Sequence, residues 1–349
     1  MLTIVFGTRP EYLKIKPLIL ALKQNNINYK LFHISQHEHI EIDLEDCQIN
    51  YITLSHSENM TRLCLLSTEI MAKLDNVLEN TSYLLVQGDT ATAFFSALAA
   101  FHKKIPVIHL EGGLRTYDLQ NPFPEEAYRS MISRIATYHL CPDEGSKGNL
   151  AKENIYKNVY VIGNTILDLV HLYSLTPVIE NEVMITIHRR ENWDSLLRIF
   201  NEINTIAQKK TELKFTWILH PNPSIRSQIL NYIEIHTISS NLLLSEPLNH
   251  FEMTSRIAKC NFLITDSGGI QEEASFLGKH CYVIRKLTER NSIPSEYITL
   301  VPDISELYSI IENKKIQLLA PCNVYGNGEA SQRFVEIYKE FLKLQLSLL

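Results

Sequence analysis

Short runs of apolar and β-branched residues alternate with amphipathic stretches along nearly the whole chain. Each run has the length of one buried strand, and most are followed by a segment with helical periodicity. This alternation is typical of a parallel sheet that is covered by helices on both faces. The predicted strands are Leu2–Phe6, Tyr29–Ser35, Tyr83–Gln87, Val107–Leu110 and Val159–Ile162, then Val183–Ile187, Phe215–Leu219, Leu242–Leu244, Phe262–Thr265 and Cys281–Ile284.

The two series of strands predict two doubly wound, Rossmann-like α/β domains. We expect the first domain over residues 1–165 and the second over 166–330, with a hinge between Gly163-Asn164 and Thr176-Pro177. The last helix, 331–349, is long enough to pack back on the first domain. Because ligands of such sheets bind beyond the carboxyl ends of the strands, we expect the loops of both domains to face one cleft.

Length, charge and cysteine distribution indicate which kinds of protein and partner to expect. The chain has 349 residues, 45% of them hydrophobic, which is enough for two cores, and its formal net charge is −6. A negative net charge without basic runs argues against nucleic acid or an anionic membrane as partner. The start of the chain does not resemble a signal peptide and no apolar run is long enough to span a bilayer, so we expect a cytoplasmic protein. The six cysteines are scattered singly, so we expect reduced thiols and no disulfide framework.

The segment Asp266-Ser267-Gly268-Gly269 lies between a predicted strand and a predicted helix. Ser267 is a helix cap, and the two glycines leave the first backbone N–H groups of the helix open to an anion. Glu273, one turn further on, is placed to accept two hydroxyls of a ribose. The pattern suits a nucleotide diphosphate, although for Ser-Gly-Gly taken alone an ordinary N-cap after a turn is the better explanation.

Charged residues also follow the predicted strands of the first half. The loop after the first strand carries Arg9 and Lys14, Asp89 follows the third strand, and Glu111 follows the fourth. A carboxylate at the end of a buried strand is costly unless it is paired or functional. The expected partners of Glu111 are Arg115 and Arg129, and a structural ion-pair network explains these three residues about as well as catalysis does. For Asp89 alone, a cap of the following helix is the simpler interpretation.

Two histidines end strands of the second half, His188 in the segment His188-Arg189-Arg190-Glu191-Asn192 and His220 before a proline. A single histidine at such a position is more often structural, but two at equivalent loops beside arginines favour a function. The spacing of histidines and carboxylates does not match a metal site, so we expect no metal.

Seven segments together resemble the non-hydrolysing UDP-N-acetylglucosamine 2-epimerases, in the same order and over nearly the whole chain. They are Gly7-Thr8-Arg9-Pro10-Glu11, Gly88-Asp89-Thr90, Glu111-Gly112-Gly113-Leu114-Arg115-Thr116, Pro124-Glu125-Glu126, His188-Arg189-Arg190-Glu191-Asn192, Asp266-Ser267-Gly268-Gly269-Ile270-Gln271-Glu272-Glu273-Ala274 and Asn323-Val324-Tyr325-Gly326-Asn327-Gly328. The resemblance implies two domains arranged as in the GT-B glycosyltransferases, a homodimer, and interconversion of UDP-GlcNAc with UDP-ManNAc for surface polysaccharides.

The resemblance also implies roles for individual residues. The catalytic positions are Asp89, Glu111, Glu125 and His188, with Asp89 and Glu111 as the proton-transfer pair at C2 of the sugar. The expected substrate-binding residues are Arg9, Lys14, Arg115, Arg129, His220, Ser267, Gly268, Gly269, Glu273 and Arg290. Gln36 matches one contact of an effector site, where His39 departs from the usual residue. The segment Thr288-Glu289-Arg290 departs from the family pattern in running into Asn291.

The chemistry is consistent with a reaction that uses no cofactor. The hydrogen on C2 has no adjacent carbonyl, and an NAD-dependent enzyme would first oxidise C3, yet no Gly-x-Gly-x-x-Gly follows the first strand. The remaining route expels UDP from C1 while a carboxylate takes the C2 proton, leaving a glycal. A glycosyltransferase of GT-B fold, a hydrolysing 2-epimerase and a nucleotide-sugar binding protein are the alternatives.

Overall fold

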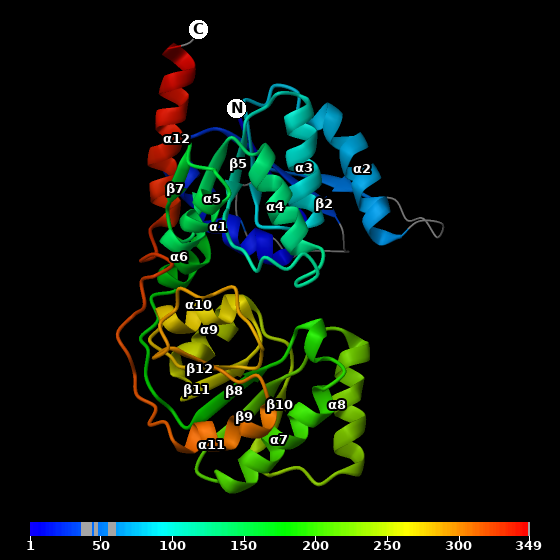
Figure 1. Ribbon diagram of the computed structural model, residues 1–349, viewed down its shortest axis with the longest axis vertical. Coiled ribbons are helices and arrows are strands. Elements are labelled where there is room, and N and C mark those ends of the chain that lie inside the picture. The colour runs from blue at the N-terminus through cyan, green and yellow to red at the C-terminus, as the bar shows by residue number, and fades with distance from the viewer. Residues whose placement is uncertain (36–43, 45–47, 55–60, 348–349) are drawn as a thin grey trace. The chain divides into compact units, whose positions relative to one another are not determined.

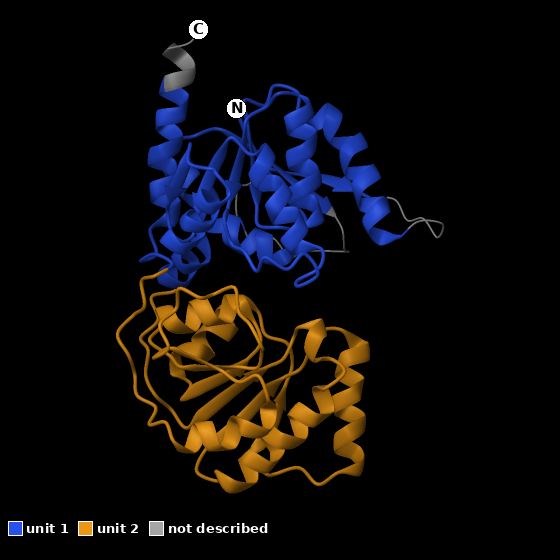
Figure 2. Cartoon of the chain, viewed as in Figure 1, with its two compact units in different colours: residues 1–172, 325–349 blue, residues 173–324 orange. Residues whose placement is uncertain are grey.

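The structure is a computed structural model that describes residues 1–35, 44, 48–54 and 61–347. The chain forms two compact units (Figures 1 and 2), of which unit 1 comprises Met1–Leu172 with Tyr325–Leu349 and unit 2 comprises Tyr173–Val324. Each unit is a parallel sheet with helices alternating along the chain. The predicted class, two Rossmann-like α/β domains, is confirmed. The cleft between them stays a prediction.

Unit 1 contains, within the described residues, a seven-stranded parallel sheet in the order β3-β2-β1-β4-β5-β6-β7. The order reverses between β1 and β4, and in sheets of this kind ligands bind beyond the carboxyl ends of the strands at such a reversal. The strands are β1 Leu2–Phe6, β2 Tyr29–Ser35, β3 Ile49–Thr53, β4 Tyr83–Gln87, β5 Val107–Leu110, β6 Tyr138–Cys141 and β7 Val159–Val161. The helices are α1 Arg9–Gln24, α2 Arg62–Val77, α3 Ala91–His102, α4 Glu125–Ile135, α5 Glu144–Lys152, α6 Thr165–Leu172 and α12 Ala330–Ser347.

Unit 2 repeats this plan with a six-stranded parallel sheet in the order β10-β9-β8-β11-β12-β13, which reverses between β8 and β11. Its strands are β8 Glu182–Thr186, β9 Lys214–Ile218, β10 Leu242–Ser245, β11 Phe262–Thr265, β12 Cys281–Val283 and β13 Ile298–Leu300. Its helices are α7 Leu196–Lys209, α8 Pro223–Ile235, α9 His250–Lys259, α10 Gly268–Phe276 and α11 Leu307–Glu312, with 3-10 turns at Arg190–Asn192 and Ile304–Glu306.

The sequence analysis missed three strands, β3, β6 and β13. β3 and β13 are edge strands whose residues are largely half-exposed or exposed, so they lack a continuous apolar run. β6 is interior but short, and a tyrosine and a histidine interrupt its apolar pattern. Their pairing with neighbouring strands, and not their own composition, decides that they are strands.

The last helix, α12, belongs to unit 1. Phe341 stacks on Tyr138 with ring centroids 3.8 Å apart, and Tyr338 packs edge-on against Tyr83 at 5.6 Å. The helix begins where the carboxylate of Asp168, on α6, accepts the backbone N–H groups of Ala330 at 2.9 Å and of Ser331 at 2.6 Å. This cap holds α6 against α12, which explains why the units divide after residues 172 and 324 and not at the expected 165 and 330.

Two histidines lie inside the sheet of unit 1. His109 on β5 and His139 on β6 are register partners, and both side chains are buried. Burial lowers the pKa of His109 to about 4. Burial, with His109 and Arg115 nearby, lowers the pKa of His139 to about 3. Both rings are therefore neutral in the folded protein near pH 7.

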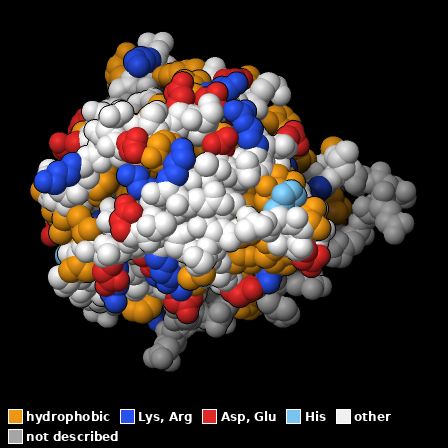
Figure 3. Space-filling view, turned by 90° about the horizontal axis from the view of Figure 1, so that it is seen from below, with side chains coloured by type: hydrophobic (Ala, Val, Ile, Leu, Met, Phe, Trp, Pro, Cys, Tyr) orange, Lys and Arg blue, Asp and Glu red, His pale blue; other side chains and the backbone are white. Residues whose placement is uncertain are grey.

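Neither the surface charges visible in Figure 3 nor the helices that the structure describes point to a membrane. The face in Figure 3 shows acidic and basic side chains interspersed among polar and apolar ones, which gives that face no field of a single sign. None of the helices in the described part of the chain combines the length and the apolar character that a membrane crossing requires.

We predict that Asp168→Ala destabilises the protein by about 2 to 4 kcal/mol, because it leaves two buried N–H groups without their charged acceptor. The matched control is Asp303→Ala, an exposed cap whose side chain accepts from the Ser305 N–H at 3.0 Å and pairs with Arg198 at 2.9 Å. Its removal should cost clearly less, because water can replace the lost contacts. Urea denaturation measures both. Equal losses would contradict the role given to Asp168.

We also predict that the buried histidines make stability depend on pH. Between the ordinary histidine pKa of about 6.5 and the lowered folded-state values, the unfolded chain binds protons that the folded protein does not. The free energy of unfolding should therefore fall as the pH falls through this window, by up to about 1.4 kcal/mol per pH unit for each histidine. Urea denaturation of wild type and His139→Gln at several pH values checks this, and parallel profiles would contradict it.

Candidate active site

A buried carboxylate connects the two loops at the point where the strand order of unit 1 reverses. Glu11, in the first turn of α1, accepts hydrogen bonds from Gly7 N at 3.0 Å and Thr8 Oγ1 at 2.8 Å, and also from Thr90 Oγ1 at 2.7 Å. Burial raises the pKa of Glu11, while these hydrogen bonds act in the opposite direction. The loop after β1 and the loop after β4 are thus held together, which places α1 beside Asp89.

Glu111 directly follows β5 and adopts a left-handed backbone conformation, φ 67°. Its carboxylate receives Lys14 Nζ at 2.7 and 2.5 Å, Gln87 Nε2 at 2.5 Å and Asn164 Nδ2 at 3.2 Å. The Glu111 side chain is only 7% exposed. A carboxylate there is stabilised in its ionised form by an ammonium group and two amides, and these contacts fix its orientation.

Asp89 follows β4 and pairs with Arg129 of α4, which also lies 3.3 Å from Glu126. The Asp89 side chain is 26% exposed, so it is more accessible than Glu111. A Cβ atom on Gly88 would lie 3.5 Å from Glu111 Oε2. The turn that carries Asp89 therefore lies directly against the Glu111 carboxylate, and the structure brings the two acids together at the carboxyl end of the sheet.

Of the two partners expected for Glu111, Arg115 is engaged elsewhere. It is buried and binds Glu153, with Nε 2.6 Å from Oε1, and Ser133 at 2.9 Å. Lys14, which the sequence analysis did not name as a partner, pairs with Glu111, a contact between residues far apart in the sequence. The sequence did indicate that Lys14 lies near the carboxyl end of the sheet, because it is in the first turns of the helix that follows β1.

Arg9 and Glu125 are each the first residue of a helix, α1 and α4 respectively. Arg9 is exposed and Glu125 is partly exposed, so both side chains can reach a ligand. Gln36 and His39, expected at an effector site, lie outside the described residues.

In unit 2 the corresponding connection is made by Asp266, which is fully buried. Its carboxylate accepts the backbone N–H groups of His188 and Arg189 and the side-chain amide of Asn192, each at 2.9 Å. The loop after β8 is thereby held against the loop after β11. The sequence analysis quoted Asp266 but assigned it no role.

His188 and His220 lie close together, with ring centroids 5.1 Å apart. Burial lowers the pKa of His188 and of His220, and the nearby Asp266 acts in the opposite direction. Neutral imidazoles can donate one hydrogen bond and accept another.

Ser267 caps α10, and its side chain accepts from Ile270 N at 3.5 Å. A Cβ atom on Gly268 would lie 2.9 Å from Glu289 Oε1, whereas nothing lies within 4 Å of one on Gly269. The first turn of α10 is therefore backed by Glu289 on one side and open on the other. Its N–H groups, which a helix leaves unpaired, can receive an anion from the open side.

Arg290 was expected to bind substrate, but its side chain is buried and pairs with Glu272 and, at 3.4 Å, with Glu289. Burial alone would raise the pKa of Glu289, yet the guanidinium groups of Arg290, Arg189 and Arg285 together hold it far below its usual range. This cluster supports the back of the α10 turn, and the sequence analysis missed Arg285 and Glu289 as its members.

Glu273, the residue expected to bind ribose, lies on α10 with its side chain 8% exposed. It accepts a hydrogen bond from Thr254 Oγ1 at 3.1 Å, and His250 Nε2 lies 3.2 Å from its Oε2. These contacts orient the carboxylate. Its role towards a ribose stays a prediction.

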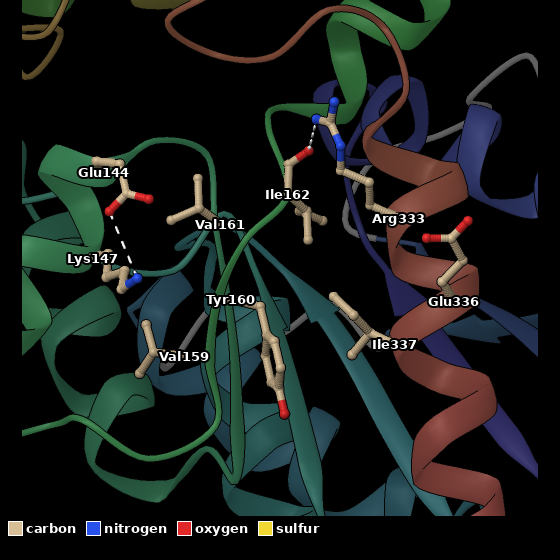
Figure 4. Close-up of a pocket in the computed structure, with 9 residues that line it drawn as sticks. All are labelled: Glu144, Lys147, Val159, Tyr160, Val161, Ile162, Arg333, Glu336 and Ile337. Carbon is tan, nitrogen blue, oxygen red and sulfur yellow. Dashed lines mark hydrogen bonds and ion pairs between the residues drawn. The ribbon is translucent and has the colours of Figure 1, made fainter.

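A separate pocket of about 450 Å³ lies on unit 1 between α5, β7 and α12 (Figure 4). It is lined by Glu144, Lys147, Val159, Tyr160, Val161, Ile162, Arg333, Glu336 and Ile337, none of which was predicted to be a site residue. Arg333 donates to Ile162 O at 2.9 Å and Lys147 pairs with Glu144 at 3.7 Å (Figure 4). The side chains of Arg333, Lys147 and Glu144 therefore already have partners within the protein.

Known proteins are similar to this chain over most of its length. The family model for UDP-N-acetylglucosamine 2-epimerase matches residues 20–339. A UDP-N-acetylglucosamine 2-epimerase of Neisseria meningitidis is 37% identical over 95% of this chain and 97% of that protein, and one of Bacillus subtilis is 34% identical over 95% and 93%.

Solved structures agree as well. The crystal structure of the Neisseria meningitidis enzyme bound to UDP-GlcNAc has a TM-score of 0.84 at 32% identity, covering 97% of this chain and 99% of that one. The S. aureus MnaA–UDP structure has a TM-score of 0.83 at 28% identity, covering 98% and 97%. These matches also confirm the predicted GT-B-like fold class. With its motifs, fold and relatives in agreement, the chain belongs to the UDP-N-acetylglucosamine 2-epimerase family.

Proposed function

We propose that the protein interconverts UDP-GlcNAc and UDP-ManNAc without a cofactor, by eliminating UDP and adding it back. The observation that carries the proposal is the pair of acids at the carboxyl end of the first sheet, with Glu111 held by Lys14 and Asp89 on the adjoining turn. The relatives support the substrate, because one is named for UDP-GlcNAc and is bound to it in its crystal structure.

In the proposed reaction, one acid takes the proton from C2 while the C1–O bond breaks. The electron pair of the C2–H bond forms the C1=C2 double bond of a glycal, and the pair of the C1–O bond leaves with UDP. Delivery of a proton to the other face of C2 and return of UDP to C1 complete the inversion. Two acids on neighbouring turns, Asp89 and Glu111, suit this exchange, and Glu125 shares or tunes the proton.

The departing diphosphate requires donors that stabilise its charge. The open N–H groups of Gly268 and Gly269 at the start of α10, together with Arg9 and His188, are proposed to hold it. A neutral His188 would donate a hydrogen bond to the diphosphate without adding a positive charge. Glu273 is proposed to bind the ribose.

Arg115 and Arg290 take different roles from those implied by the family pattern. Because their guanidinium groups are buried in contacts with Glu153 and with Glu272 and Glu289, we propose that they support the site without touching substrate. Arg129 pairs with Asp89 and Lys14 pairs with Glu111, so in this scheme the two cations orient the two acids. By the resemblance, we further propose a cytoplasmic homodimer that supplies surface polysaccharide synthesis and closes over its substrate.

The test is NMR of UDP-GlcNAc incubated with the protein in D₂O. We expect UDP-ManNAc with deuterium at C2, because the eliminated proton exchanges with solvent. Free ManNAc would indicate a hydrolysing enzyme, and no exchange in the absence of an acceptor would indicate a transferase. Either result would overturn the proposal.

The matched variant for this test is Asp89→Asn, which removes a proton acceptor without changing the size of the side chain. We expect it to bind UDP with unchanged affinity in calorimetry and to lose deuterium incorporation by about 100-fold or more. Normal exchange in this variant would remove Asp89 from the mechanism.

Two adjacent glycines separate binding from stability. Gly269→Ala adds a methyl group where the described residues leave open space. The free energy of unfolding should therefore stay unchanged or rise by up to about 1 kcal/mol. UDP binding should become weaker. Gly268→Ala should instead destabilise the protein, because its methyl group meets Glu289 Oε1 at 2.9 Å. Calorimetry with UDP and urea denaturation measure the two effects. Unchanged UDP affinity in Gly269→Ala would contradict the proposed diphosphate site.

A further inference from the structure

The ring of His109 contacts the two turns that carry the proposed catalytic acids. His109 Nε2 lies 2.8 Å from Gly88 O, and because a carbonyl only accepts, Nε2 carries the hydrogen. On its other side, His109 Nδ1 would lie 3.4 Å from a Cβ atom on Gly112. Gly88 precedes Asp89 and Gly112 follows Glu111, so one buried ring lies between both turns.

Each turn contains a residue in the left-handed backbone region, Gly88 with φ 70° and Glu111 with φ 67°. A glycine adopts this conformation freely, whereas a residue with a side chain such as Glu111 needs support from the surrounding fold. The Gly88 N–H donates to Leu110 O at 2.9 Å, and the Gly112 N–H donates to Leu140 O at 3.0 Å. The bond from His109 to Gly88 O therefore adds a second contact between the Asp89 turn and β5, beside Glu111.

We infer that His109 is a positioning residue for the epimerase reaction, one that sets the separation of Asp89 and Glu111 through its bond to the Gly88 carbonyl. The inference rests on the proposed function, because it takes Asp89 and Glu111 to be the catalytic acids. It assigns His109 itself no contact with substrate. A displaced Gly88 peptide would move Asp89 relative to the C2 proton. A misplacement of about 1 Å in a catalytic group lowers rates by about 100-fold.

The chain offers a matched control in His139. It is the register partner of His109 on β6 and is buried to a similar extent, and among the described residues neither Nδ1 has a hydrogen-bond partner. The two histidines differ in the bond that His109 Nε2 makes to Gly88 O. Replacing His139 disturbs the same part of the core. It leaves the bond between His109 and Gly88 O in place.

The experiment compares kcat, KM for UDP-GlcNAc and C2 deuterium exchange in His109→Leu, His109→Gln and His139→Leu, with urea denaturation of each. A glutamine amide nitrogen can occupy the position of the histidine Nε2 and donate to Gly88 O. We expect His109→Leu to lower kcat and exchange by about 100-fold with little change in KM, and His109→Gln to restore most of this loss. His139→Leu should lower stability and leave kcat close to that of wild type.

Three results would overturn the inference: a folded His109→Leu with wild-type kcat, a His109→Gln no better than His109→Leu, or a His139→Leu that loses kcat equally. Should His109→Leu fail to fold, His109→Asn replaces it, because an asparagine amide reaches only the position of Nδ1 and cannot donate to Gly88 O. A wild-type protein without C2 exchange would overturn the proposed function and this inference together. An active wild type with unaffected His109 variants would overturn this inference alone.

Discussion

In each unit a buried carboxylate bridges the two loops at the point where the strand order reverses. Glu11 bridges the loops after β1 and β4, and Asp266 bridges the loops after β8 and β11. Burying an ionised carboxylate is costly, and the cost is offset only where several donors surround it. Here the donors are backbone N–H groups and hydroxyls of the loops themselves, so the bridge and the loop conformation stabilise each other.

These bridges divide the acidic residues of the chain into two groups. The carboxylates of Glu11 and Asp266 accept hydrogen bonds from the loops, and Glu289 is surrounded by arginines. All three therefore have structural roles. Arg129 pairs with Asp89 and Lys14 pairs with Glu111, beside the loops that the bridges position. The Asp89 side chain is 26% exposed, whereas the bridging carboxylates lie inside the fold, where a change of charge is costly.

The arginines divide in the same way. Arg115 and Arg290 have buried guanidinium groups with carboxylate partners, while Arg9 is exposed at a helix start next to the Glu11 bridge. The first turn of α10 likewise has a buried side and an open side. Glu289 lies behind Gly268, and among the described residues nothing fills the space at Gly269. Backbone N–H groups at a helix start favour an anion by themselves, and in the proposed diphosphate site Arg9 and His188 add further donors.

The sequence by itself determined the two Rossmann-like units and the loops that carry the site, because strand and helix periodicity and glycine turns are local properties of the chain. It also indicated Asp89 and Glu111, which directly follow predicted strands. Only the tertiary structure decided which charges pair, because Lys14 and Glu111, or Arg115 and Glu153, meet through sheet order and not through spacing. For the same reason the edge strands β3 and β13 and the cap that Asp168 provides for α12 were beyond sequence reasoning, since each depends on a neighbour distant along the chain.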